Sequence, residues 1–238
     1  MLSARRMAAP EKRRDVAQGT LFHVRVRGPM ACFTRPEFKA ERVSYELMTP
    51  SAARGVLEAI FWKPAIRWHI HRIAVLAPIR WTSFRRNEVR DLASPRIPFL
   101  VASDPEQRSQ RNTLALRDVD YLVTCGFELT SRAGESDNMP KFSKMFQQRL
   151  ERGQHFEPPY LGMRELAADV EPATRETLEP IERGVTRRLG QMFFDFEPVE
   201  IGRGRQLFFE AQLDSGVLHV PPLQAVLRDN GVRARRAR

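Results

Sequence analysis

Two histidines, His69 and His71, are the nearest that this sequence comes to a metal-binding pair. Two positions apart on a strand, they would share one face, as some zinc ligands do. No cysteine or carboxylate accompanies them at ligand spacing, so we interpret them as a phosphate contact or a plain sheet face and expect no metal site. The sequence also lacks a Walker motif, a dinucleotide fingerprint and a Ser-His-Asp or Cys-His arrangement, and we expect no cofactor.

Arginine supplies most of the remaining side chains that could do chemistry. The formal net charge is +10, and five of the 39 basic residues are lysine, which leaves 34 arginines. A genome that favours arginine codons could explain this ratio, but it does not explain the excess of positive charge. Such an excess attracts phosphates and supports binding through counterion release, so nucleic acid is the expected partner. RNA is the first candidate and DNA a further one, whereas an anionic membrane is a weaker rival because no basic amphipathic helix stands out.

Alternation and turn signals predict the elements that must position these side chains. Strands are expected over 20–27, 65–84 and 113–129, and helices over 50–63 and 141–152. Gly28-Pro29 should end the first strand, and Ala77-Pro78 should bend the second. The first helix should begin at Thr49-Pro50-Ser51, with Phe61 and Trp62 packed into its last turn. The charged segment 85–112 has little periodicity, which predicts a mobile loop or a projecting hairpin.

The order strand, helix, strand, strand, helix opens the β-α-β-β-α-β unit of a ferredoxin-like fold. We therefore predict an α+β protein with a ferredoxin-like, RNA-recognition-type domain over 20–157. Residues 158–228 are expected to form a small antiparallel β-rich appendage. Its strands are predicted over 192–199, 206–213 and 216–220, and its helix over 223–228. Residues 1–19 and 229–238 are interpreted as a flexible basic extension and a basic tail.

The scarcity of cysteines and of long apolar runs suggests the cellular compartment. Two cysteines, Cys32 and Cys125, make no disulfide framework and fit a reducing cytosol. No apolar run is long enough to span a membrane, and the basic start has no following apolar region, unlike a secretory signal. We therefore expect a cytoplasmic protein with no membrane partner.

Basic residues of the first strand, the first helix and the adjoining loops would border one side of such a sheet. Guanidinium groups suit phosphates and also stack on bases, and aromatic residues interleave with them. A solvated surface position is the alternative for each. The expected RNA contacts are His23, Arg25, Arg27, Arg35, Lys39, Arg54, Lys63, Arg85, Arg86, Arg108, Arg111 and Arg117.

Four blocks of the sequence together resemble one known family. They are the first strand with Gly28-Pro29 and Cys32-Phe33-Thr34, the block VSYELMTPSAARGVLEAIFWKP, the block QRNTLALRDVDYLV, and the run from KFSKMFQQRLERGQ through PYLGMREL. The chain resembles the precursor-CRISPR-RNA-processing subunit of type I-C CRISPR systems, the "d" variety of the fifth Cas protein family. Each block is weak alone, but their shared order over residues 20–228 is specific.

This resemblance implies an endoribonuclease that cuts the repeat hairpin of precursor CRISPR RNA without a metal. The enzyme would then stay on the 5′ handle, beside the backbone-forming and large subunits of an interference complex. Metal-free cleavage uses the ribose 2′-hydroxyl as nucleophile, and it needs a base, a cation at the phosphorane and an acid. The products are a 2′,3′-cyclic phosphate and a 5′-hydroxyl.

The family's proposed tyrosine, lysine and histidine correspond to Phe61, Lys141 and Phe142, so only the lysine keeps its type. Lys141 is the candidate for stabilising the phosphorane, although it could be an exposed lysine in the first turn of a helix. Candidate proton-transfer groups are Tyr45, which could instead stack or pack, and His155, which could instead be an ordinary surface histidine. The two phenylalanines also keep open a non-catalytic subunit that only binds the 5′ handle.

Overall fold

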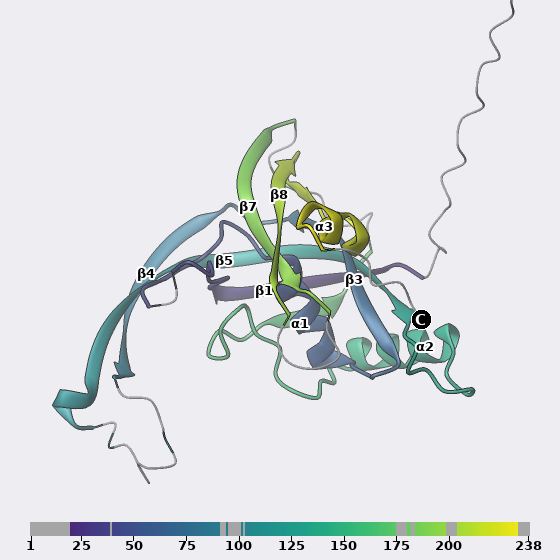
Figure 1. Cartoon of the computed structure of the whole chain (residues 1–238), viewed down its shortest axis with the longest axis horizontal. Coiled ribbons are helices and arrows are strands. Elements are labelled where there is room, and N and C mark those ends of the chain that lie inside the picture. Colours follow the sequence, from purple (N-terminus) through teal and green to yellow (C-terminus); the bar gives the residue numbers. More distant parts are fainter. Residues whose placement is uncertain are drawn as a thin grey trace, which may run out of the picture.

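The computed structural model describes residues 20–38, 40–90, 94, 101, 103–174, 180–181, 184–198 and 204–232 (Figure 1). The described part is an α+β fold with a mostly antiparallel sheet, which confirms the predicted class. Four central strands lie in the order β6-β1-β5-β3, and each is antiparallel to its neighbours. Their bounds are Phe22–Ala31 for β1, Ile66–Val75 for β3, Arg108–Leu129 for β5 and Asp169–Pro172 for β6.

Helices α1 (Pro50–Ile60) and α2 (Met139–Glu151) cover one face of these strands (Figure 1). Every second residue of β1 up to position 26 is buried against them, as the predicted alternation requires. Phe146 of α2 lies edge-on to Phe22 and to Trp68, with ring centroids 5.0 Å and 4.7 Å apart. Aromatic packing of this kind fixes α2 on the sheet.

The first helix begins where the sequence predicts and ends near the predicted point. The Thr49 hydroxyl accepts a hydrogen bond from the Ala52 backbone N–H at 3.2 Å, which caps the helix. Of the two residues that we predicted to pack into its last turn, only Phe61 does so. Phe61 is fully buried, but 57% of Trp62 is exposed, because the chain turns extended at Phe61 and directs the indole away from the core.

The first strand does not end at Gly28-Pro29 as predicted. It continues to Ala31, and Met30 pairs with Arg117 of β5. The strand tolerates this proline because β6 pairs with β1 only as far as Arg27. No carbonyl of β6 therefore needs a hydrogen bond from position 29, where proline has no N–H.

The predicted long second strand is divided at the expected bend into β3 and β4 (Arg80–Val89). Within β3 the register shifts between Ile70 and Arg72, so His71 lies in a β-bulge. The bulge reverses the predicted alternation, and Ile73 is buried rather than on the outer face.

The segment after Phe84 adopts the second of its two predicted forms, a hairpin. β4 pairs with β5 from Arg80 opposite Arg117 to Val89 opposite Arg108, and this ribbon reaches away from the helices (Figure 1). Residues 91–93, 95–100 and 102 of the segment lie outside the described residues. A two-residue strand, β2 (Arg42–Val43), lies parallel to β5.

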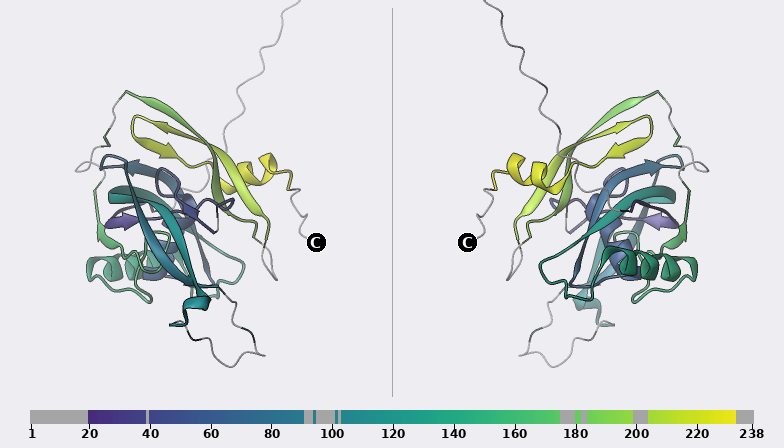
Figure 2. Two further views of the ribbon diagram at one scale, coloured as in Figure 1. Left: turned by 90° about the vertical axis from the view of Figure 1, so that its left-hand side faces the viewer. Right: turned by 90° about the vertical axis from the view of Figure 1, so that its right-hand side faces the viewer.

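The C-terminal segment contributes β7 (Thr186–Phe196), β8 (Gln206–Asp214), β9 (Val217–His219) and α3 (Leu223–Asp229). The β7–β8 pair stands above the central strands in Figure 2, with α3 beside it. β7 begins six residues before the predicted start at 192. Since β9 pairs with β3 and β6 with β1, the sheet crosses the boundary that we predicted at residue 157. The predicted extension 1–19 and residues 233–238 of the tail lie outside the described residues.

Two glycines give a matched test of this packing. Gly162 has a φ of +85°, and a Cβ there would overlap the backbone carbonyl of Cys32, whereas Gly55 in α1 has nothing within 4 Å of the same position. Gly162→Ala should therefore destabilise the protein by roughly 3 kcal/mol or more. Gly55→Ala should stabilise it by roughly 0.5–1 kcal/mol, because alanine favours the helix. Thermal unfolding of both variants checks the pair, and equal melting temperatures would contradict it.

Candidate functional site

One open pocket, of about 250 Å³, lies where three segments meet: the connection from α1 to β3, the loop between β5 and α2, and the first half of α2. Thr130 joins the segments, since its N–H donates to the Ala65 carbonyl at 2.9 Å and its hydroxyl to the Pro64 carbonyl at 2.7 Å. Residues far apart in the sequence therefore share one site. The pocket is lined by Lys63, Pro64, Ala65, Arg132, Asp137, Lys141, Phe142 and Met145.

Lys141 is held at the first turn of α2 by its surroundings. Its backbone N–H donates to the Asn138 cap at 2.9 Å, and its ammonium lies 3.3 Å from the Ser136 carbonyl and 3.5 Å from the Asp137 carboxylate. The side chain is still 45% exposed. The charge is thus positioned but open to solvent, and the helix dipole adds to its positive potential.

Lys141 shares the pocket with two further cations. Lys63, which the sequence predicted as an RNA contact, follows α1 and is exposed. Arg132, also exposed, lies in the loop between β5 and α2, and sequence reasoning missed it. Its place in the polar linker just before Lys141 was the available signal. Three cations face one carboxylate, Asp137, so the pocket has the charge to hold a phosphate.

The three positions that the resemblance singled out do meet in space. The rings of Phe61 and Phe142 are 6.0 Å apart, and the Lys141 ammonium is 5.6 Å from the Phe142 ring. Both phenylalanines are buried, and Arg149 lies over Phe61 at 5.4 Å. The lining side chains can therefore stabilise negative charge, whereas Phe61 and Phe142 provide no acid or base.

The structure does not bring Tyr45 to this pocket. Only 2% of Tyr45 is exposed, and its hydroxyl accepts the Phe193 N–H at 3.1 Å, beneath β7. Burial raises the pKa of the phenol, which further disfavours proton transfer. Arg35, a predicted RNA contact, lies 4.3 Å over the ring. This geometry supports the packing alternative that the sequence left open.

His155 is also separated from Lys141. Lys141 lies in the first turn of α2, whereas His155 follows the last turn. The helix from Lys141 to its end at Glu151 is about 15 Å long. Gly153, with a φ of +61°, reverses the chain after α2 and leads it to the last turn of α1, where the Phe156 N–H donates to the Ala59 carbonyl. His155 is exposed in this turn, away from the residues that line the pocket.

Several predicted RNA contacts instead join elements of the fold. Arg25 binds Asp120 at 2.7 Å and Glu171 at 3.0 Å, and these bonds raise the pKa of its guanidinium. Arg54 of α1 binds Asp195 of β7 at 2.6 Å. Such pairing reduces their availability for phosphate. The other predicted contacts with carboxylate partners are Arg27, Arg35, Arg86 and Arg111.

The remaining predicted contacts lie on the ribbon and on the outer face of the sheet. Arg85, Arg108 and Arg117 are exposed on β4 and β5. His23 is half-buried on the outer face, with Nδ1 3.2 Å from the Thr124 hydroxyl. Lys39 lies outside the described residues.

The pair His69 and His71 lies on the outer face of β3. The Nε2 atom of His69 is 3.2 Å from the Glu128 carboxylate. Partial burial and, to a smaller extent, the neighbouring His69 lower the pKa of His71. Within the described residues, no three His, Cys, Asp or Glu side chains gather as a metal site would need. None of the described helices is long and apolar enough to cross a membrane.

Solved structures share this fold. A structure described as a CRISPR-associated protein has a TM-score of 0.67 at 22% identity, and the likeness covers 87% of this chain and 95% of that chain. A functionally uncharacterised protein from Streptococcus mutans has a TM-score of 0.66 at 21% identity, with the same coverage.

Sequence comparisons agree over most of the length. Two proteins named CRISPR pre-crRNA endoribonuclease Cas5d, from Mannheimia succiniciproducens and Thermus thermophilus, are each 42% identical to this chain over 83% of its length. The matches cover 93% and 90% of those proteins. The family model of the CRISPR-associated protein Cas5, Cas5d type, matches residues 22–231. This chain therefore belongs to the Cas5d family of CRISPR-associated proteins.

Proposed function

We propose that this chain is an endoribonuclease that cleaves precursor CRISPR RNA within the repeat hairpin. The 2′-hydroxyl of the RNA would attack the adjacent phosphate without a metal, leaving a 2′,3′-cyclic phosphate and a 5′-hydroxyl. The observation that carries the proposal is the gathering of Lys63, Arg132 and Lys141 around one open pocket. The names of the two relatives support the substrate.

In this mechanism the pocket works through charge and position. Lys141, held by Asn138 and Asp137, stabilises the phosphorane, while Lys63 and Arg132 hold the flanking phosphates. Phe61 and Phe142 cannot exchange protons, so water accepts the proton of the 2′-hydroxyl and supplies one to the 5′-oxygen. The reaction then lacks the part of the acceleration that a positioned acid and base would provide.

The chain would remain on the 5′ handle as a subunit of an interference complex with backbone-forming and large subunits. The β6-β1-β5-β3 order, with α1 and α2 on one face, supports a ferredoxin-like unit whose long β4–β5 ribbon and C-terminal strands extend it. Exposed Arg85, Arg108 and Arg117 would hold RNA, or DNA, along this ribbon. The free, buried thiols of Cys32 and Cys125 support a cytoplasmic location.

A second candidate is a structural subunit that binds the 5′ handle and cuts nothing. The buried Phe61 and Phe142 pair favours it, since these rings stand where the family resemblance places a tyrosine and a histidine. Its phosphate-binding surface would be the same three cations.

One experiment separates the two candidates. The purified protein is incubated with its cognate repeat RNA in EDTA, and the products are analysed for a cyclic phosphate end. The nuclease should release this fragment, and replacing the 2′-hydroxyl beside the cut with hydrogen should stop the release completely. RNA that is bound but stays intact would establish the structural subunit instead.

A further inference from the structure

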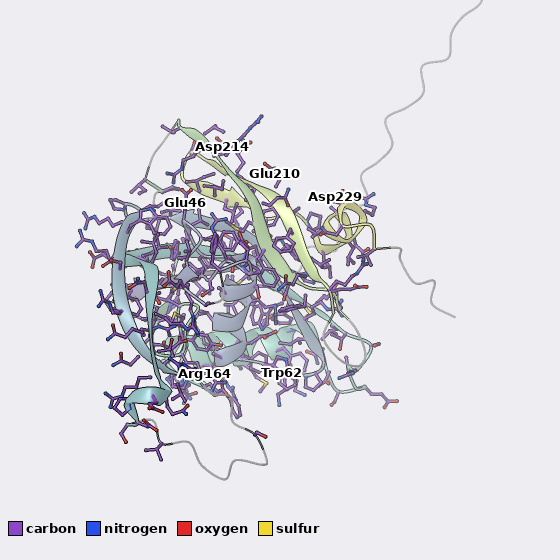
Figure 3. All side chains as sticks on the ribbon, turned by 60° about the vertical axis from the view of Figure 1, so that its left-hand side comes forward. Glu46, Trp62, Arg164, Glu210, Asp214 and Asp229 are labelled. Atoms are coloured by element: carbon purple, nitrogen blue, oxygen red, sulfur yellow. The ribbon has the colours of Figure 1, made fainter. Side chains whose placement is uncertain are left out.

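Two aromatic side chains held at the end of α1 are highly exposed to solvent. Phe156 is 83% exposed and Trp62 57%, the highest values among the large hydrophobic residues described. Exposed apolar side chains that lie on one surface mark sites where a ligand or partner binds. Figure 3 labels Trp62 in the lower part of the molecule, away from Glu210 and Asp214 on β8.

Both residues are fixed to the end of α1 by the backbone. Trp62 stands between Phe61, whose N–H still bonds to the Leu57 carbonyl, and Lys63, which lines the pocket. The Phe156 N–H donates to the Ala59 carbonyl at 2.7 Å. Both residues of the aromatic pair, Trp62 and Phe156, are therefore tied to the end of α1, although they are 94 positions apart, and Lys63 next to Trp62 connects this end to the pocket.

Cations accompany the aromatic pair. Arg149 donates to the Ile60 carbonyl at 3.1 Å and lies over the Phe61 ring, which places a fixed positive charge at the end of α1. Arg152 is exposed at the end of α2, and Lys63 is exposed on the pocket side. Exposed aromatic rings among cations are the combination that binds single-stranded nucleic acid, because rings stack on bases while cations bind phosphates.

We propose that Trp62 and Phe156 form a stacking site for unpaired nucleotides of the RNA that flank the phosphate held in the pocket. The inference rests on the proposed function, because the pocket defines where the RNA enters. A site of this kind would position the cleaved strand where it leaves the paired stem. The chemistry recognised is the flat face of a base, so little dependence on base identity is expected.

Binding is best measured with RNA that cannot be cut, carrying hydrogen in place of the attacking 2′-hydroxyl. Two such hairpins are compared, one with unpaired nucleotides on both sides of the cut site and one trimmed to the stem. Trp62→Ala and Phe156→Ala should each weaken binding of the flanked hairpin by about tenfold and leave the trimmed hairpin nearly unchanged. Trp62→Phe should keep most of the affinity, because a ring remains.

Phe38→Ala is the matched control for Phe156→Ala, since it removes the same side chain from a 48% exposed position between β1 and β2, outside the aromatic pair. It should leave the affinity for the flanked hairpin within about twofold of the wild type, well short of the loss that one stacked base represents. Equal losses for Phe156→Ala and Phe38→Ala, or equal losses on both hairpins, would overturn the stacking site. Unchanged affinity in all variants would also overturn the stacking site.

The two proposals fail in different ways. A wild-type protein that never cuts cleavable repeat RNA contradicts the nuclease, while the difference between flanked and trimmed hairpins is still measurable. A nuclease whose variants at Trp62 and Phe156 bind both hairpins normally contradicts the stacking site alone.

Discussion

Replacing Lys141 with alanine is expected to slow cleavage of the repeat RNA by roughly 100-fold or more. In the proposed mechanism this ammonium stabilises the phosphorane, and no other cation takes its place on the first turn of α2. Binding should fall by less than about threefold, because one phosphate contact among many contributes little affinity. Single-turnover rates and equilibrium binding, measured on the same RNA, separate the two effects.

Lys144→Ala is the control for this prediction. Lys144 has the same charge on the same helix and is exposed, but it does not line the pocket. Its removal should change the cleavage rate by less than about twofold, as expected for an exposed charge. If Lys141→Ala reduced rate and affinity equally, Lys141 would be a phosphate contact with no special role in the transition state.

Introducing a proton-transfer group at position 142 should have an effect of similar size in the opposite direction. Phe142→His places an imidazole beside Lys141, where the ring of Phe142 now lies 5.6 Å from the ammonium. A positioned acid or base contributes roughly 100-fold or more, so cleavage near neutral pH should accelerate by about that factor. The rate should also acquire a dependence on pH around the pKa of the new histidine.

Phe142→Asn provides the comparison, because its amide is polar but cannot transfer a proton. Both variants exchange a buried ring for a polar group at a position that packs against Phe61, so both should lower the melting temperature similarly. Adding Phe61→Tyr to Phe142→His would supply a second group across the 6.0 Å gap. If Phe142→His were no faster than Phe142→Asn, the acid and base of this chain would have to lie elsewhere.

Much of the fold followed from local patterns. Alternation in β1 and β5 and the capping residue Thr49 predicted elements that the structure contains. The predictions were wrong where pairing with a strand distant in the sequence set the end or the register of an element. β1 passes through Gly28-Pro29 because β6 does not pair there, and the bulge at His71 depends on the register with β5.

The candidate site could be predicted only in part. Lys141 and Lys63 were identified as separate candidates, but nothing in the spacing of residues 63, 132 and 141 shows that they share a pocket. That proximity depends on the two hydrogen bonds of Thr130 to the residues after α1. Local sequence left Tyr45 as a candidate catalyst, but β7, from a distant part of the chain, packs over it and donates a hydrogen bond to its hydroxyl.

The sequence by itself determined the class of fold, the excess of positive charge, the family and the presence of phenylalanine, which transfers no proton, at positions 61 and 142. These properties depend on residue types and on their order over short stretches. The tertiary structure alone decided which cations are paired with carboxylates and which stay open to solvent. Arg25 pairs with Asp120, 95 positions away, whereas Lys63, Arg132 and Lys141 outnumber their one carboxylate and stay open to solvent. Long-range pairing sets the environment of each charge, and periodicity carries no information about it.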